Sequence, residues 1–493
     1  MLYFWLMNNK LYCLLFTVII PIVLTAQEKW GLRKCVEYAW QNNISVKQQE
    51  LQAAESILNE KQAKLSSLPN ANFSNNTGLQ LGRSVDPTTN QFTTTQLLFQ
   101  GFNLNADVMI YNWNRVKNSL IAAKLDTKAA NASIEKTKND IALSVATSFL
   151  QALLNVEQIA VVKIQFEQTK NQLIATRKRV DAGSLPELNA LELEAQLARD
   201  STNIINSTAT ADISILQLKA LLNLDAAASF ELDVPPVQLI PVEKMEDLQP
   251  EFVFATALKN QPTQKLNLLR LQSFQTNVKV AKASMYPTIS GFLGLGTNFA
   301  NPFKKVTGFE FVGYSPISPA SSIINVSGTN YFIQDPRFNF NQSQKSLGEL
   351  WKGYGGQLDN NFRQNFGVAI NVPIFNNGGA AKRAFETSKL NVKNAALEIE
   401  KADMQLKQDI YQAYTNANSA MQRFNAATTT LVVTQKTYDF AKKRYDVGLL
   451  GTFELITNQN NLNKSMMDKL IAQYEYVFRI KVLEFYKGVG LKL

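Results

Sequence analysis

The spacing of apolar residues changes along the chain from a helical period to a strand period. Over residues 141–173 apolar side chains recur at steps of three and four, as on one face of an α-helix. Further along, the period becomes two, because Phe366, Val368 and Ile370 alternate with small or polar residues. The pattern therefore predicts an α+β protein that combines long helices with strands.

Two stretches are longer and freer of helix breakers than an ordinary globular helix. Residues from about Asn105 to Val180 contain neither proline nor glycine, and the same is true of residues 380–446. At ~1.5 Å per residue, the first would form a helix on the order of 110 Å long. Only a second helix can bury the apolar stripe of such a helix, so we expect a coiled-coil seam.

One helical motif occurs twice in the chain. The sequence RVDAGSLPELNALELEAQL at residues 179–197 aligns without a gap with RYDVGLLGTFELITNQNNL, which lies 265 residues later. Each copy places a glycine, Gly183 or Gly448, between two helical stretches. Glycine ends a helix readily in the left-handed conformation, and a short connection makes the flanking helices antiparallel neighbours. The expected hairpin tips lie at about residues 181–187 and 446–452.

Further matches indicate that the whole chain is an internal duplication. Pro69 corresponds to Pro287 and Gly78 to Gly296, in each case 218 residues apart. Helix, strand, strand, long helix and hairpin thus follow one another twice in the same order. The expected domains are a first repeat at residues 27–248 and a second at residues 249–493.

Four segments have the length and alternation of strands that cross a membrane, since a tilted strand of ~10 residues spans a bilayer. Four strands cannot close a barrel, and their open edges could not lie in lipid, whereas three copies would supply twelve strands. A soluble sheet with one wet face is the competing interpretation, and the strand count is the argument against it. The four segments lie at about residues 70–83, 91–101, 287–299 and 364–376.

The N-terminus has the features of an export signal. A short polar start that ends at Lys10 precedes an apolar run over residues 11–24, and Ala26 offers a small residue for cleavage. We therefore expect a signal peptide at residues 1–26, with Met1 or Met7 as the translated start. No later run of 18 apolar residues was found, so the mature chain is expected to lack a transmembrane helix.

Composition excludes most enzyme classes. The chain has no histidine, which removes Ser-His-Asp and Cys-His catalysis and His-ligated zinc sites. Cys35 is the single cysteine after the signal, so no intrachain disulfide forms. The net charge of +10 comes from lysines and arginines spread along helices with matching acids, which indicates solvated surface rather than a nucleic-acid site. We expect no catalytic, cofactor or metal site and no nucleic-acid partner.

The duplicated plan resembles the TolC family of outer-membrane efflux proteins over nearly the whole mature chain. The most specific pieces are the two glycine hairpin motifs and the strands led by Pro69 and Pro287. The resemblance implies a homotrimer with a twelve-stranded barrel in outer-membrane lipid and a helical tunnel in the periplasm. An equatorial region would comprise residues 225–250 and both termini. Residues 300–363, rich in Gly, Asn, Ser and aromatics, would be an extracellular loop of the kind carried by Bacteroidetes-type members.

The resemblance also implies that the tips meet a periplasmic adaptor (membrane fusion) protein, which connects the channel to an inner-membrane pump. Leu185 and Leu450 are apolar residues that recur at both turns, where packing in the core is the alternative to docking. The candidate docking residues are Gly183, Leu185, Val447, Gly448, Leu449 and Leu450.

The family's closed entrance implies a gate beside these tips. Tyr445 matches a tyrosine of the gate and Glu454 an acidic position, while Leu450 and Thr457 stand where the family pattern has a basic and an acidic residue. We therefore expect a bond between Tyr445 and Glu454. The alternative is that Tyr445 only packs and Glu454 faces water. Three acids cluster near the tip of the other hairpin, where a threefold ring of them would select or bind cations and a solvated helix surface is the alternative: Glu187, Glu192 and Glu194.

Three functions remain open from the sequence. The leading one is a passive exit duct for small toxic compounds in a tripartite efflux pump. The second is the outer-membrane channel of a type I protein secretion system. The third is a periplasmic coiled-coil structural protein without a pore, which would have no use for four strands of membrane-spanning length.

Overall fold

The computed structural model describes residues 29–85, 92–93, 96–234, 240–316, 323–374 and 379–488. The chain forms two compact units, and each contains segments of both expected repeats, so residue 248 is not a boundary between units. The signal peptide expected at residues 1–26 lies outside the described residues. The first unit comprises Met1–Leu58, Lys124–Ser273 and Asn391–Leu493, and the second comprises Asn59–Ala123 and Phe274–Leu390.

Eight of the described helices form four pairs of equal length, with 11, 22, 67 and 36 residues. Members of a pair are separated by the same 218 or 265 residues as the sequence motifs, which supports the proposed duplication. Beside them lies one short 3-10 helix, η2 (Met245–Leu248). The pairs are α2 (Leu32–Asn42) with α6 (Pro250–Asn260), α3 (Ile44–Leu65) with α7 (Pro262–Ala283), α4 (Arg115–Asp181) with α10 (Ala380–Asp446), and α5 (Glu187–Leu222) with α11 (Thr452–Lys487).

In the first unit the core lies where the short helices pack on the long ones. Val145, Phe149 and Leu153 of α4 are buried against α2, α5 and α11. A second cluster joins Ile410 of α10 to Ile480 of α11, η2 and α6. The stripe on α4 thus has helical neighbours, and the coiled-coil prediction is confirmed.

Helix α4 differs from the expectation in one respect. It contains a stretch that is long and apolar enough, by length and composition, to cross a membrane. Val145, Phe149 and Leu153 are buried in the chain's own core, so we assign this stretch to packing. Cys35 lies in the same core, where burial raises the pKa of its thiol to about 12 and keeps it in the unreactive neutral form.

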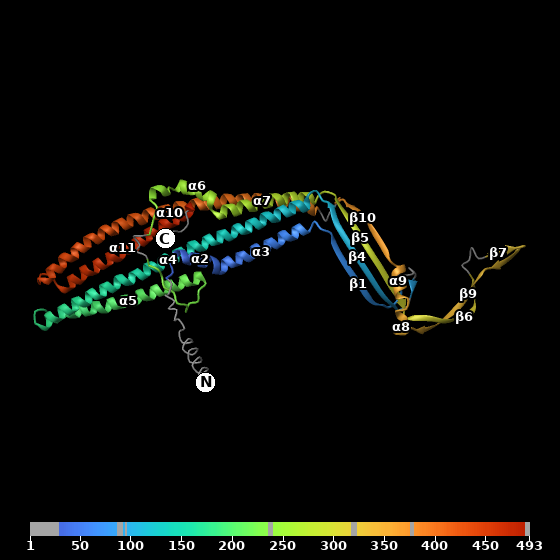
Figure 1. The fold of residues 1–493 in the computed structure, drawn as a ribbon, viewed down its shortest axis with the longest axis horizontal. Coiled ribbons are helices and arrows are strands. Elements are labelled where there is room, and N and C mark those ends of the chain that lie inside the picture. Colours follow the sequence, from blue (N-terminus) through green and yellow to red (C-terminus); the bar gives the residue numbers. More distant parts are fainter. Residues whose placement is uncertain are drawn as a thin grey trace, which may run out of the picture. The chain divides into compact units, whose positions relative to one another are not determined.

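The second unit contains one four-stranded antiparallel sheet in the order β1-β4-β5-β10. Figure 1 shows the four strands side by side. Its edge strands β1 and β10 each have one neighbour among the described strands. The strands are β1 (Asn70–Gln80), β4 (Leu97–Tyr111), β5 (Thr288–Pro302) and β10 (Arg363–Asn371).

The strand predicted at residues 91–101 was placed wrongly. β4 continues to Tyr111, and α4 starts at Arg115 rather than near Asn105. Residues 101–108 alternate between polar or small and apolar side chains, and this period of two outweighs the absence of proline and glycine. The last two residues of the segment predicted at 364–376 lie outside the described part of the chain.

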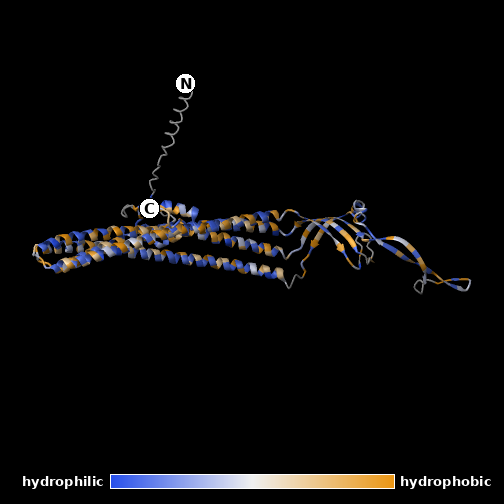
Figure 2. Cartoon of the chain, turned by 90° about the horizontal axis from the view of Figure 1, so that it is seen from below, coloured by the Kyte–Doolittle hydropathy of each residue, from blue (hydrophilic) through white to orange (hydrophobic). Residues whose placement is uncertain are grey.

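The two faces of the sheet have opposite character. In the register, Ile370 pairs with Ile289, Phe366 with Leu293, and Leu104 with Phe73, so one face carries an apolar row. Phe366, which belongs to this row, is 81% exposed in the single chain. Figure 2 shows the apolar residues along the strands. The opposite face carries mainly polar and small side chains, with cross-strand partners such as Asn72 with Asn105, Asn70 with Asp107, and Asn103 with Gly296, and a few apolar ones such as Phe292.

The segment at residues 300–363, predicted to be an extracellular loop, contains strands and short helices. Two of its strands form a long hairpin, and its short helices cover one end of the sheet, where Phe299 stacks on Trp351 at 5.5 Å. The four remaining short strands form two small hairpins. These elements are β2 (Ser84–Val85), β3 (Phe92–Thr93), β6 (Lys304–Pro316), β7 (Ile323–Val326), β8 (Thr329–Phe332), β9 (Gln334–Gln344), α8 (Leu347–Leu350) and α9 (Tyr354–Asn360).

Candidate functional site: the hairpin tips and the polar contacts behind them

Both hairpin tips are built by the same backbone turn. Gly183 and Gly448 have φ angles of 70° and 78°, a left-handed conformation that costs glycine little. The amide of Gly183 donates to the carbonyl of Val180, and that of Gly448 donates to Tyr445, at 2.8 and 3.0 Å. In each tip the next amide reaches back to an arginine carbonyl, which completes the helix-ending motif.

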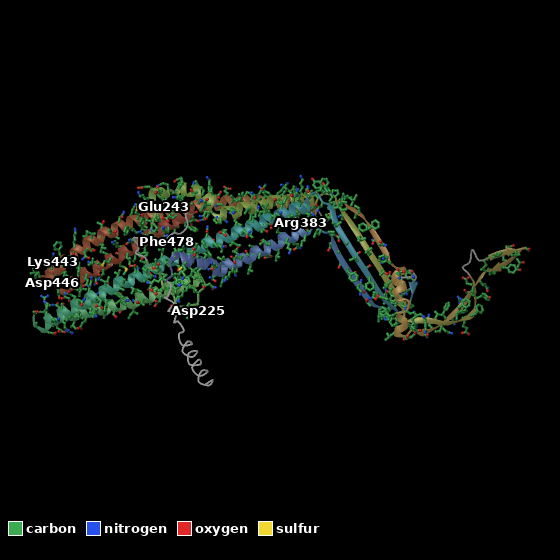
Figure 3. All side chains as sticks on the ribbon, viewed as in Figure 1. Asp225, Glu243, Arg383, Lys443, Asp446 and Phe478 are labelled. Atoms are coloured by element: carbon green, nitrogen blue, oxygen red, sulfur yellow. The ribbon has the colours of Figure 1, made fainter. Side chains whose placement is uncertain are left out.

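The apolar side chains at the tips are exposed to different degrees. Val447 and Leu449 are each 69% exposed, whereas Leu185 and Leu450 are half-buried. The charged side chains of Lys443 and Asp446 lie at this end of α10 (Figure 3). At the second tip, Val447 and Leu449 are therefore more accessible than Leu185 and Leu450, the two leucines that recur at both turns.

Tyr445 joins the two hairpins from a buried position. Its hydroxyl shares a hydrogen bond of 2.9 Å with the hydroxyl of Thr176 in α4 and accepts a longer one from Thr452 at 3.4 Å. The guanidinium of Arg179 lies 5.9 Å from the centre of its ring. Tyr445 of α10 thus connects this helix to α4 and α11 through its hydroxyl group.

The bond expected between Tyr445 and Glu454 is not formed within the described chain. Glu454 is exposed, and the hydroxyl of Tyr445 is occupied by two threonines. Sequence alone could not find Thr176, because it belongs to the other hairpin, 269 residues away, whereas Thr452 lies seven residues after Tyr445 in the same hairpin. Thr457 is exposed and only bonds back to the carbonyl of Phe453.

The acids of the first hairpin are largely paired. Arg177 donates to Glu187 and, at 2.6 Å, to Glu194, while Glu192 is half-buried. The hydrogen bond to Glu187, followed by the charges of both acids, raises the pKa of Arg177. An arginine between two carboxylates leaves less free negative charge at this tip than the sequence count of acids indicated.

A buried polar cluster that the sequence did not reveal lies behind the tips. Asp200 is fully buried, and its carboxylate accepts hydrogen bonds of 2.7–2.9 Å from Gln165, Thr169 and Gln196. Gln459 of α11 in turn donates to Thr169 at 3.1 Å. Polar residues on the apolar stripes of helices were the available signal, since buried polar groups need partners.

The cluster and the tyrosine both lie where the two hairpins meet, because Gln459 and Tyr445 bond to Thr169 and Thr176 of α4. Buried charges are costly unless they are hydrogen-bonded, so Asp200 fixes the register of α4 against α5. Among the described residues no group of three or more His, Cys, Asp or Glu is placed to hold a metal ion. The hydrogen bonds of Tyr445 and Gln459 hold the two helical hairpins together in this structure.

Residues 36–224 and 338–484 match the family described as outer membrane efflux protein, which is more than half of the chain. A curated relative, Toxin and drug export protein A of Aggregatibacter actinomycetemcomitans, is 22% identical over 375 residues, which cover 76% of this chain and 69% of that protein. The match to the family model and the fold agree on one class.

Solved structures show the same fold at low identity. The outer membrane protein VceC from Vibrio cholerae aligns with a TM-score of 0.68 and 14% identity over 94% of this chain and 97% of that one. The open state of the MtrE outer membrane channel of Neisseria gonorrhoeae aligns with a TM-score of 0.66 and 16% identity over 93% and 88%.

These findings define an outer-membrane channel rather than an enzyme. The chain belongs to the outer membrane efflux protein family, the TolC family. It resides in the outer membrane and extends into the periplasm.

Replacement of Asp200 by alanine should destabilise the helical unit. Three donors would lose a buried acceptor, at a cost of roughly 3 kcal/mol in the free energy of unfolding. The measurement is the denaturation midpoint of the detergent-solubilised protein, followed by circular dichroism at helical wavelengths. Asp212→Ala, an exposed change on the same helix, is the control. Equal midpoints for the two variants would show that the cluster does not contribute to stability.

Proposed function

We propose that three copies of this chain form one outer-membrane exit duct, through which substrates pass passively while an inner-membrane transporter supplies the energy. The observation that carries the proposal is the sheet, which has one apolar face, one polar face and two edge strands. Backbone groups at an open edge cannot remain unpaired in lipid. Three sheets joined edge to edge would give twelve strands and leave a lumen.

The polar face of the sheet would line that lumen. Asn72, Asn103 and Asn105 lie on this face, and such amides hydrogen-bond to water without adding charge. The apolar row that includes Phe366 and Ile370 would face the acyl chains, where its exposure costs nothing. The aqueous path would continue between the long helices α4 and α10 and their copies.

The periplasmic end would be closed by the contacts behind the tips. Tyr445, Thr176 and Thr452 would hold the two hairpins of each chain together in the resting state, with Glu187, Glu192 and Glu454 beside them. Release of these bonds would let the hairpins move apart, and a partner that binds the released arrangement better would shift the equilibrium toward it. We call this set of bonds the Tyr445 lock. A trimer would contain three such locks, and they would open together.

The tips are the surface we assign to a periplasmic adaptor protein. Val447, Leu449 and the half-buried leucines Leu185 and Leu450 form apolar turns held in shape by Gly183 and Gly448. The relative named Toxin and drug export protein A is compatible with two kinds of cargo, small toxic compounds or polypeptides. We favour small compounds in a tripartite pump, and a type I secretion channel is the second candidate.

Removal of the Tyr445 lock should open the channel. The double variant Tyr445→Phe/Thr176→Val deletes the 2.9 Å bond while it keeps the packing volume. Its open probability in a planar bilayer should exceed that of the wild type at least severalfold, because a buried hydroxyl bond contributes about 1 kcal/mol and three are lost per trimer. Glu454→Gln should leave the conductance unchanged. The lock would be refuted if Glu454→Gln opens the channel and the double variant does not.

A charge at the tips should prevent docking without disturbing the channel. Leu449→Asp with Leu450→Asp is expected to abolish resistance of cells to exported drugs, since burial of a charge in an apolar contact is costly. The control is Leu449→Met with Leu450→Met, which retains apolar side chains and should retain resistance. Full resistance in the aspartate variant, with normal amounts in the outer membrane, would place the adaptor contact elsewhere.

A further inference from the structure

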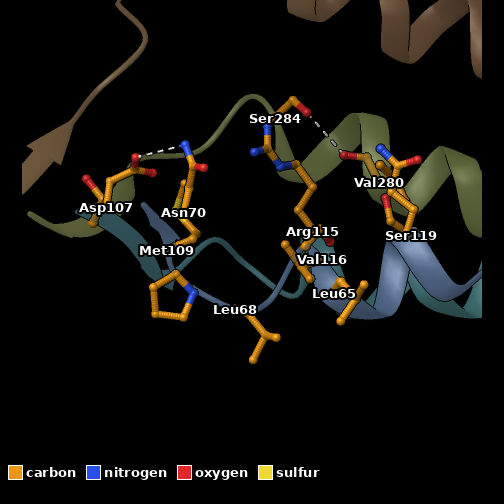
Figure 4. A pocket seen from close by; sticks show the side chains of 14 residues that line it. Leu65, Leu68, Asn70, Asp107, Met109, Arg115, Val116, Ser119, Val280 and Ser284 are labelled. Carbon is orange, nitrogen blue, oxygen red and sulfur yellow. Dashed lines mark hydrogen bonds between the residues drawn. The ribbon is translucent and has the colours of Figure 1, made fainter. Parts of the chain in front are cut away.

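A cavity of about 750 Å³ lies within the second unit, between the polar face of the sheet and the helix ends that adjoin it (Figure 4). The strands contribute Asn70, Asp107 and Ser290, all on the polar face according to the register. The volume is in the range of sites for small organic molecules. Its lining combines polar groups with apolar side chains such as Met109 and Val116.

One part of the cavity carries a carboxylate that has no ion-pair partner among the described residues. Asp107 accepts a hydrogen bond of 3.4 Å from the side-chain amide of its neighbour Asn70. Among the described residues, no lysine or arginine forms an ion pair with it. The carboxylate is exposed on the cavity side of the sheet, so a cationic amine of a ligand would find a partner there at small desolvation cost.

Another part of the cavity carries a cationic side chain without an ion pair, at the start of a helix. Arg115 is the first residue of the 67-residue helix α4, whose first turn contains no acidic residue. A cation at the start of a helix opposes the macrodipole, which favours anions there. No ion pair of Arg115 is found within the described chain, and the hydroxyl of Ser119 lines the same cavity one turn later. This part is therefore suited to a carboxylate.

A short turn connects β4, which carries Asp107, to α4, which begins at Arg115. Trp113 and Asn114 both have left-handed backbone conformations, with φ of 55° and 60°. The indole of Trp113 donates to the carbonyl of Pro287 at 2.8 Å and packs on Tyr286 at 4.9 Å between ring centres. A strained turn that is held by tertiary contacts therefore joins the strand of Asp107 to the helix that begins at Arg115.

We infer that this cavity is a binding site for small amphoteric molecules, which pass through it on the way from the helical part of the duct to the barrel. The ammonium of the ligand binds Asp107 and its carboxylate binds Arg115, while the apolar body lies against Met109 and Val116. The inference rests on the proposed function in one respect, because the polar face of the sheet must face the lumen.

The test uses the whole detergent-solubilised protein and ciprofloxacin, a fluorescent zwitterion with a secondary amine and a carboxylate. Fluorescence anisotropy titration should show saturable binding. Asp107→Asn and Arg115→Gln should each weaken it about tenfold, as expected for loss of one partly exposed charge-assisted contact. Lys117→Gln, an exposed change in the same first turns of α4, is the matched control and should bind like the wild type.

Two modified ligands separate the roles of the charges. The methyl ester of ciprofloxacin keeps only the amine, so Arg115→Gln should not change its affinity. The N-acetyl derivative keeps only the carboxylate, so Asp107→Asn should not change its affinity. The site is overturned if the wild type does not bind the zwitterion, or if both variants bind it as tightly as the wild type.

Conductance of the same samples distinguishes this failure from failure of the duct. Absence of binding by a protein that conducts in planar bilayers overturns the site and leaves the duct. Binding with the expected variant pattern by a protein that never conducts overturns the duct and leaves the site.

Discussion

The open edges of the four-stranded sheet are the constraint on which the rest of the molecule depends. β1 and β10 each offer a row of backbone donors and acceptors that no described strand of the same chain satisfies. In water such edges are tolerated, but beside lipid each unpaired group costs several kcal/mol. A chain of this family in the outer membrane can satisfy them only with another strand. In the trimer that we propose, the apolar face of the joined sheet would meet lipid and the polar face would meet water.

The helical hairpins also contain polar groups that need hydrogen-bond partners. Their seams bury polar groups: Asp200 is satisfied within the first hairpin, whereas Tyr445 and Gln459 bond to residues of the other hairpin. Polar contacts of this kind specify one arrangement, yet each can be exchanged for water at modest cost. In the gate that we propose, contacts with this property would hold the hairpins together at rest and still allow them to separate.

The sequence was sufficient for elements and faces, and insufficient for contacts between distant segments. Period and glycine placement predicted the long helices, the two turns and the apolar row that contains Phe366. The end of β4 was missed because a run without proline and glycine was taken as helix. The partners of Tyr445 were missed because Thr176 comes from the other hairpin, and the role of Asp200 because a lone acid in a helix is normally solvated. The docking and gating residues remain proposals.

The mass of the purified protein in mild detergent tests the central claim most directly. Light scattering with the detergent contribution subtracted should give about three times the 55.1 kDa of the chain, less the signal peptide. The trimer should persist on dilution, because separation would expose the edges of β1 and β10 together. A protein of one chain's mass that retains its strands and helices would contradict the account, since a single sheet cannot close a barrel.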